Sequence, residues 1–336
     1  MTGGGDAPGL NGVIESVSKC LLRANHLPVG IQDGFLGVFE GRTRIIRLED
    51  LIGLHAQAGT FLGTSNKCGT AGREQEFLTK FKELGLDGLV AAGGDGTFRG
   101  LEPFKDEIPL IGVPKTIDND LSGTEATFGF DTACSVVAES VDALRATAEA
   151  HRRLIVVEAM GRTAGWIALG GGMASYADAI LIPERKFSRA KLFAFLAEKM
   201  KVQRGAVLVV SEGATAENEE AQVAFRVEGA PQAERYGGIA HLLAHQVEAA
   251  TGWEARAVVL GHLQRSRAPT TTDRFLTLAL GVQVAAMVQE KAWGKAVVYR
   301  SGRIERVPVE ELMGPPRLVD PDHRWVKMAQ ALGIFI

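Results

Sequence analysis

Short apolar runs alternate with stretches of helical periodicity along most of this chain. The runs that predict strands are residues 88–92, 109–113, 154–158, 206–210, 256–260 and 296–299. Most are continuously apolar, as expected of parallel strands that are buried on both faces. The stretches with helical spacing are 131–150, 239–250 and 273–291. This alternation predicts an α/β protein with doubly wound, mainly parallel sheets, in which ligands bind at the carboxyl ends of the strands.

Composition limits the classes of protein that this chain can belong to. Its 336 residues are enough for two domains, each with its own core. A formal net charge of −3 provides no basic footprint for nucleic acid or for an anionic membrane. The 3 cysteines are widely spaced and form no CxxC pattern, which indicates a reducing compartment and no zinc site. Because no apolar run approaches the roughly 18 residues of a spanning helix, we expect a soluble, cytoplasmic protein.

Glycine-rich turns are the first motifs that carry chemistry. Gly93-Gly94-Asp95-Gly96-Thr97 directly follows the run that ends at Ala92. Adjacent glycines let backbone N–H groups close on phosphate oxygens, and Asp95 is placed to hold Mg²⁺ on those phosphates. An ordinary strand-to-helix turn explains one such motif equally well. A second loop of this kind, Gly3-Gly-Gly-Asp6, favours the phosphate interpretation.

The loop at residues 3–6 has no strand-like run before it. Such turns normally follow a strand, and a parallel sheet that lacks one leaves unpaired backbone groups, each costing about 1–3 kcal/mol. We therefore expect a few further apolar residues upstream.

A polar segment, Pro-Lys-Thr-Ile-Asp-Asn-Asp at 114–120, follows the apolar run that ends at Val113. A polar turn is the simplest explanation of Asp-Asn-Asp taken alone. The alternative is a site in which one carboxylate takes a proton and another helps to hold a metal, while Lys115 and Thr116 face phosphate oxygens.

Cationic residues flank the remaining strands. Met160-Gly161-Arg162 follows the run 154–158, and Gly261-His262-Leu-Gln-Arg265 follows the run 256–260. Arg153 precedes the first of these runs and Arg256 begins the second, and Glu212, past the run 206–210, is placed to accept sugar hydroxyls. Each arginine alone is more simply a solvated surface charge. Several cations beside glycine loops favour a phosphorylated substrate.

Together these motifs resemble the phosphofructokinase family. GGDAPGLN, GGDGT, PKTIDND, MGR and GHLQR occur in the family's order and spacing, from residue 3 to about residue 300. The resemblance implies two Rossmann-like domains, a homotetramer or homodimer with shared active sites, and phosphoryl transfer from Mg-ATP to the 1-hydroxyl of fructose 6-phosphate, a step of glycolysis. It implies a nucleotide-binding domain of residues 1–130 plus about 253–295, and a sugar-phosphate-binding domain of about 131–252 plus the C-terminal tail.

The resemblance also implies roles for single residues. Asp118 is the expected catalytic base, and Thr116 and Arg162 face the transferred phosphoryl group. Asp95 is the expected Mg²⁺ ligand, with Asp120 a candidate for orienting it. The residues expected to line the nucleotide are Gly5, Gly94, Asp95, Gly96 and Thr97. Those expected to bind the sugar phosphate are Thr116, Asp118, Met160, Gly161, Arg162, Glu212, His262 and Arg265, with Arg153 and Arg256 reaching it from a neighbouring subunit.

Two positions bear on the phosphoryl donor. Lys115 is typical of the family's pyrophosphate-dependent branch, but that branch usually has a second Asp where this chain has Gly96. A lysine near phosphate oxygens helps either donor, whereas an Asp at position 96 would exclude an α-phosphate by bulk and charge. We therefore expect ATP as the main donor, and a pyrophosphate-dependent phosphofructokinase is the alternative.

Other departures from the family concern regulation and substrate binding. Asn66 stands where an arginine is usual, with Lys67 a candidate substitute. The basic residues of the bacterial effector site are largely replaced by Glu15, Ser16 and Gln57, so regulation by ADP or phosphoenolpyruvate is not expected.

Two other readings compete with the kinase. An inactive sugar-phosphate sensor is less favoured because Asp95, Asp118 and Arg162 are all present. Lipid and NAD kinases share GGDGT but lack the other motifs. The acidic stretch 212–234 lacks strand character and predicts an exposed insertion, and Pro315-Pro316 predicts a loop before a short closing helix.

Overall fold

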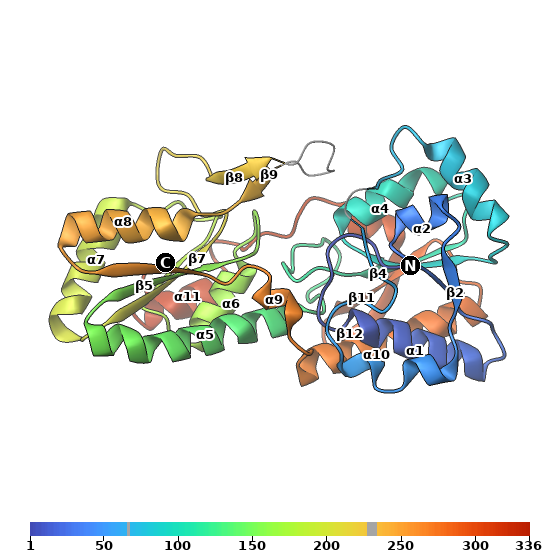
Figure 1. The fold of residues 1–336 in the computed structure, drawn as a ribbon, viewed down its shortest axis with the longest axis horizontal. Helices are drawn as coiled ribbons and strands as arrows, with labels where there is room; N and C mark the ends of the chain where they lie inside the picture. Colours follow the sequence, from blue (N-terminus) through green and yellow to red (C-terminus); the bar gives the residue numbers. More distant parts are fainter. Residues whose placement is uncertain (66–67, 227–233) are drawn as a thin grey trace. The chain divides into compact units, whose positions relative to one another are not determined.

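The computed structural model describes residues 1–65, 68–226 and 234–336. Within those ranges the chain divides into two compact units, each built around its own sheet. Unit 1 contains Met1–Thr132 and Arg265–Pro316, and unit 2 contains residues 133–226, 234–264 and 317–336. Figure 1 shows both units, and each is described separately below.

The sheet of unit 1 has the order β12-β11-β4-β3. Its strands are β3 (Leu89–Gly93), β4 (Leu110–Pro114), β11 (Lys295–Arg300) and β12 (Arg303–Pro308). β3, β4 and β11 are parallel, and β12 is antiparallel at the edge. The first residues extend this sheet beside β3, since Ala92 N–H donates to the Met1 carbonyl at 3.0 Å and Gly3 N–H to the Ala92 carbonyl at 2.9 Å. The glycine-rich turn at residues 3–6 therefore does follow a sheet-paired segment.

Helices cover both faces of this sheet (Figure 1). On one face lie α1 (Leu10–Arg23) and α10 (Thr271–Gln289), and on the other α2 (Phe35–Phe39), α3 (Glu74–Glu83) and α4 (Asp95–Leu101). Buried phenylalanines Phe35, Phe77 and Phe98 join these last helices to strand residues such as Ala91 and Val298 in one core. The remaining elements of unit 1 are β1 (Val29–Ile31), β2 (Thr43–Ile45), η1 (Leu48–Leu51), η2 (Leu54–Ala56), η3 (Glu102–Phe104) and η4 (Val309–Met313).

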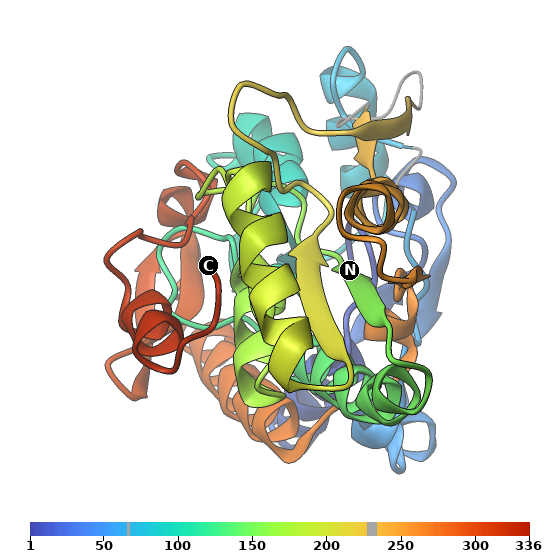
Figure 2. The ribbon, with the colours of Figure 1, turned by 90° about the vertical axis from the view of Figure 1, so that its left-hand side faces the viewer.

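The sheet of unit 2 is wholly parallel, with the order β10-β5-β7-β6. Its strands are β5 (Leu154–Ala159), β6 (Ala179–Leu181), β7 (Ala206–Ser211) and β10 (Ala255–Val259). In Figure 2, α7 (Arg189–Val202) lies in the foreground beside β7. With α8 (Ile239–Thr251) it buries Leu192 and Leu243 against Val156 and Leu208. The other helices of this unit are α5 (Phe130–His151), which begins in unit 1, α6 (Trp166–Ala174), α9 (Leu263–Ser266) and α11 (Arg324–Ala331).

The structure confirms the predicted fold class, the apolar-run strands and the long helices. It differs at the acidic stretch, where β8 (Val223–Arg226) and β9 (Glu234–Tyr236) form an antiparallel pair. The second stretch of chain in unit 1 is Arg265–Pro316, whereas the resemblance implied about 253–295. Residues 253–264 belong to unit 2 because β10 pairs with β5 in the sheet of that unit. Among the helices within the described ranges, none combines the length and apolarity needed to cross a membrane.

Candidate active site

Three loops of unit 1 meet at one edge of its sheet. The segment Met1–Gly3, β3 and β4 are parallel neighbours, so the loops that follow them start from the same edge. Lys115 N–H donates to the Gly93 carbonyl at 2.8 Å, and its ammonium donates to the Gly5 carbonyl. A Cβ at Gly3 would lie 2.6 Å from Thr97 Oγ1, so only glycine permits this approach. The structure thus unites three motifs that are far apart in sequence.

Lys115 is an unusual cation because its side chain is buried, with 3% of its surface exposed. Burial is the main reason that the Lys115 pKa is lowered to about 7, and the nearby Arg265 guanidinium lowers it further. Asp118, Asp6 and Asp120 act in the opposite direction. The Arg265 guanidinium itself donates to the Asp6 carbonyl. Two cationic side chains therefore lie on the first glycine loop, where phosphate oxygens would relieve their repulsion.

Asp118 is held as a buried carboxylate by the loop around it. Only 5% of its surface is exposed, and its backbone N–H donates to Thr116 Oγ1 at 3.1 Å. Thr127 fixes the loop, because its hydroxyl donates to the Thr116 carbonyl at 2.7 Å and its N–H donates to Asn119 Oδ1 at 3.0 Å. Within the described residues Asp118 Oδ1 has no hydrogen-bond partner. A buried acceptor without a partner costs about 1–3 kcal/mol, so its presence indicates a functional group.

Asp95 and Gly96 form the outer part of this edge. Asp95 Oδ1 lies 2.8 Å from Arg99 Nε, and 31% of the Asp95 side chain is exposed. The part of the chain that the structure describes contains no cluster of three or more metal-ligating side chains. A single carboxylate fits Mg²⁺, which takes most of its ligands from phosphates and water, and does not fit an all-protein cage. A Cβ at Gly96 would have nothing within 4 Å.

In unit 2, the neighbouring strands β10, β5 and β7 end beside the second set of predicted residues. Arg162 N–H donates to Glu212 Oε1 at 3.0 Å. Met160 N–H donates at 3.3 Å to the side chain of Gln264, which is fully buried and which the sequence analysis did not single out. His262 follows β10 and is exposed. Unit 2 therefore brings together Met160–Arg162, Glu212 and the start of the GHLQR motif, while Arg265 lies in unit 1.

Arg153 and Arg256 lie at the opposite end of these strands. Both guanidinium groups contact Glu254, Arg153 at 3.4 Å. β5 has 6 residues and is therefore roughly 17 Å from end to end. Within unit 2, the two arginines are thus remote from Arg162 and Glu212. Asn66 and Lys67 lie outside the described residues.

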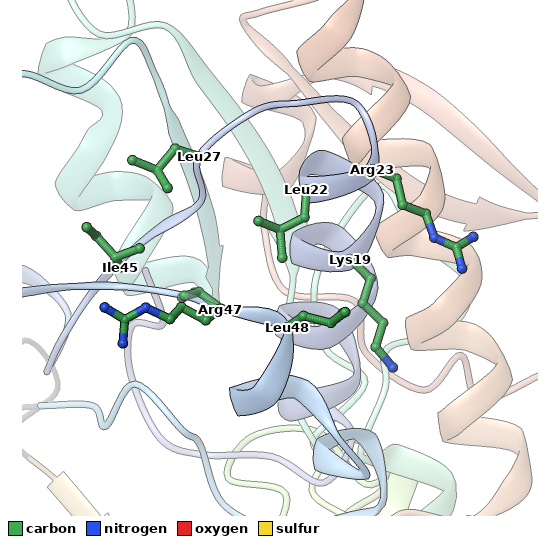
Figure 3. Close-up of a pocket in the computed structure, with 8 residues that line it drawn as sticks. Lys19, Leu22, Arg23, Leu27, Ile45, Arg47 and Leu48 are labelled. Carbon is green, nitrogen blue, oxygen red and sulfur yellow. The ribbon is translucent and has the colours of Figure 1, made fainter.

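A groove elsewhere in unit 1 contains none of the predicted site residues (Figure 3). It is open, with a volume of about 700 Å³, and it lies between α1 and the segment that contains β2 and η1. Its lining combines three cations with apolar side chains: Lys19, Leu22, Arg23, Leu27, Ile45, Ile46, Arg47 and Leu48. The carboxyl ends of the strands, rather than this groove, therefore define the candidate active site.

The sequence model of the phosphofructokinase family matches residues 1–288. The chain belongs to the phosphofructokinase family. It is 41% identical to an ATP-dependent 6-phosphofructokinase of Chloroflexus aurantiacus, over 99% of this chain and 96% of that protein. It is 38% identical to a pyrophosphate–fructose 6-phosphate 1-phosphotransferase of Streptomyces coelicolor, over 96% of this chain and 95% of that protein. The solved phosphofructokinase of Saccharomyces cerevisiae is similar with a TM-score of 0.80 and 28% identity, over 93% of this chain and 44% of the yeast chain.

Proposed function

We propose that this chain is an ATP-dependent 6-phosphofructokinase that acts in glycolysis. It transfers a phosphoryl group from Mg-ATP to the 1-hydroxyl of fructose 6-phosphate and forms fructose 1,6-bisphosphate. The observation that carries this proposal is the buried Asp118, whose Oδ1 lacks a partner while Lys115 and the glycine loops lie at the same edge of the sheet. This arrangement offers a proton acceptor beside a phosphate-binding surface.

The residues of unit 1 serve the donor and the proton transfer in this proposal. Asp118 accepts the proton of the attacking hydroxyl, Thr116 faces the transferred phosphoryl group, and Lys115 faces phosphate oxygens of the donor. The nucleotide lies along Gly5 and Gly94–Thr97, where open space beside Gly96 is available for it. Asp95, with Asp120 as a candidate for orienting the ion, would hold Mg²⁺, which when bound neutralises charge on the phosphates.

The residues of unit 2 bind the sugar phosphate in this proposal. Met160, Gly161, Glu212 and His262 contact fructose 6-phosphate, and Arg265 of unit 1 contributes a further cation. Arg162 meets the negative charge on the transferred phosphoryl group, as a guanidinium can with paired N–H donors. The contact between Arg162 N–H and Glu212 supports this assignment because it joins two of the expected ligands.

The protein is further proposed to be a homotetramer or homodimer in which subunits share active sites. The support is the place of Arg153 and Arg256 at the far end of β5 and β10, from which they do not reach the Arg162 turn of their own unit. Mixing inactive Arg256→Ala and Asp118→Ala proteins should restore part of the activity, because some hybrid sites combine an intact arginine with an intact base. Lack of recovery after subunit exchange, shown by mass spectrometry of labelled chains, would contradict shared sites.

Pyrophosphate is the alternative donor, since Lys115 and relatives such as the Streptomyces coelicolor enzyme favour it. A coupled assay of fructose 6-phosphate phosphorylation distinguishes the candidates. We expect faster turnover with ATP than with pyrophosphate. Faster turnover with pyrophosphate would replace the proposed donor, and turnover with neither would support a catalytically silent sugar-phosphate sensor.

A further inference from the structure

The turn that carries Arg162 has a shape that its own sequence does not favour. It connects β5 to α6, and Arg162 adopts a left-handed backbone conformation with φ of 55°. That conformation costs a non-glycine residue roughly 1–2 kcal/mol. The Arg162 carbonyl oxygen packs so closely on Gly213 that a Cβ at position 213 would lie 1.8 Å from it. Such a conformation persists only where the surrounding structure holds it.

Glu184, just after β6, holds the far end of this turn. Gly165 N–H donates to both of its carboxylate oxygens, at 2.9 and 3.1 Å. Gly165 is the N-cap residue of α6, and because glycine has no side chain it cannot cap the helix in the usual way. The N–H groups at the start of a helix need acceptors, and a carboxylate is favoured there by the helix dipole. Glu184 therefore caps α6 from another part of the chain.

The same carboxylate also holds the C-terminal segment of unit 2. Val319 N–H donates to Glu184 Oε1 at 2.9 Å, and the indole N–H of Trp166 donates to the Arg317 carbonyl at 2.8 Å. His323 and Trp325 pack edge-on against Trp166, with ring centroids 5.0 and 6.1 Å away. The start of α6 is thus tied to the segment 317–325 by one direct hydrogen bond, by Glu184, which accepts from both Gly165 and Val319, and by an aromatic cluster.

Burial raises the pKa of Glu184, while the N–H donors of Val319 and Gly165 act in the opposite direction. The Glu184 carboxylate accepts hydrogen bonds on both oxygens, and the backbone N–H groups of Gly165 and Val319 take the place of water as donors. An amide could accept both N–H groups only on an oxygen at the Oε1 position, and its NH₂ group would then lie where Oε2 now accepts Gly165 N–H at 3.1 Å. The position therefore favours a carboxylate over an amide of similar size.

We propose that Glu184 is a positioning residue for Arg162: together with the C-terminal segment it holds the Met160–Gly165 turn in the form needed for phosphoryl transfer. The inference rests on the proposed function of Arg162 and extends it to a residue that does not contact substrate. Misplacement of a catalytic group by about 1 Å costs up to roughly 10²-fold in rate.

A double-mutant cycle with Glu184→Gln and Arg162→Ala tests the proposal in the full-length protein. Glu184→Gln should lower kcat about tenfold and change the KM for fructose 6-phosphate much less. In the Arg162→Ala background it should cause little further loss, because the group that it positions is absent. Trp166→Phe removes the bond to the Arg317 carbonyl and part of the aromatic packing but leaves Glu184 in place, and it should give a smaller effect of the same kind.

Asp178→Asn is the matched control for a buried carboxylate in unit 2. Asp178 accepts the Val207 N–H at 2.9 Å at the start of β7, away from the Arg162 turn. This variant should lose thermal stability but keep kcat. An unchanged kcat in Glu184→Gln, or an equal loss of kcat in both backgrounds, would overturn the positioning role.

Hydrogen exchange measured by mass spectrometry tests, without any turnover assay, whether Glu184 holds the Met160–Gly165 turn and the C-terminal segment in place. Glu184→Gln should speed exchange about tenfold in peptides that cover residues 160–166 and 317–321, whereas Asp178→Asn should not. Unchanged exchange in both peptides would overturn the inference, whatever the activity. If the wild-type protein turned over neither donor, the proposed function would fail while the exchange data still decided the role of Glu184.

Discussion

Replacing Asp118 by asparagine should lower kcat for phosphorylation of fructose 6-phosphate by about 10²–10⁴-fold. The amide keeps the volume of the side chain but cannot accept the hydroxyl proton. Because only 5% of Asp118 is exposed and Thr127 fixes its loop, the geometry of the site should be retained. Steady-state kinetics should therefore show a kcat loss with nearly unchanged KM for both substrates.

Asp120→Asn makes the same change two residues along the same loop, at the residue proposed to orient Mg²⁺. A turn that merely requires polar residues predicts little loss at either position, whereas the proposed roles predict a kcat loss for Asp118→Asn that added Mg²⁺ does not relieve and a loss for Asp120→Asn that added Mg²⁺ reduces. Near-normal kcat in Asp118→Asn would remove this residue from the proton transfer.

Replacing Gly96 by aspartate should depress kcat/KM with ATP about 10²-fold or more and affect pyrophosphate use far less. A Cβ at position 96 would meet no protein atom within 4 Å, so the folded protein can accommodate the new side chain. The added carboxylate would instead project toward the space proposed for the α-phosphate of ATP. Like charges placed together cost several kcal/mol, and each 1.4 kcal/mol corresponds to about a factor of ten. Pyrophosphate has no third phosphate to repel.

Two controls separate charge from bulk and from general phosphate binding. Gly96→Ala adds bulk alone and should reduce ATP use less than Gly96→Asp does. Lys115→Met should weaken the binding of both donors, because it removes a cation and adds no group that would exclude either donor.

The Lys115 pKa of about 7 means that its charge is present below this pH and is lost above it. The KM for either donor should therefore rise above about pH 7 in the wild type but not in Lys115→Met. Equal losses with ATP and pyrophosphate in Gly96→Asp would contradict the exclusion argument.

Many strands and loop motifs of this protein could be predicted from short stretches of its sequence. Continuous apolar runs predicted the strands of both sheets, because a strand buried on both faces needs an apolar side chain at nearly every position. Glycine-rich and charged motifs directly after those runs predicted where phosphates and carboxylates would lie, since the carboxyl ends of parallel strands share an edge. The shortest strands, such as β6 with 3 residues, gave too weak a signal.

The tertiary structure decided what depends on neighbours far apart in the chain. Strand order is one example: β10 lies beside β5, so a segment predicted for the nucleotide domain belongs to unit 2. The burial of Lys115 is another, because the pKa of a lysine is set by the groups packed around it and not by adjacent residues. Glu184 is a third, since nothing in its local sequence indicates that it caps a helix that begins at Trp166 and also holds Val319. The sequence by itself determined the elements and the chemistry at their ends. Only folding determined which ends meet, because backbone pairing and side-chain packing between distant segments leave no periodic signal along the chain.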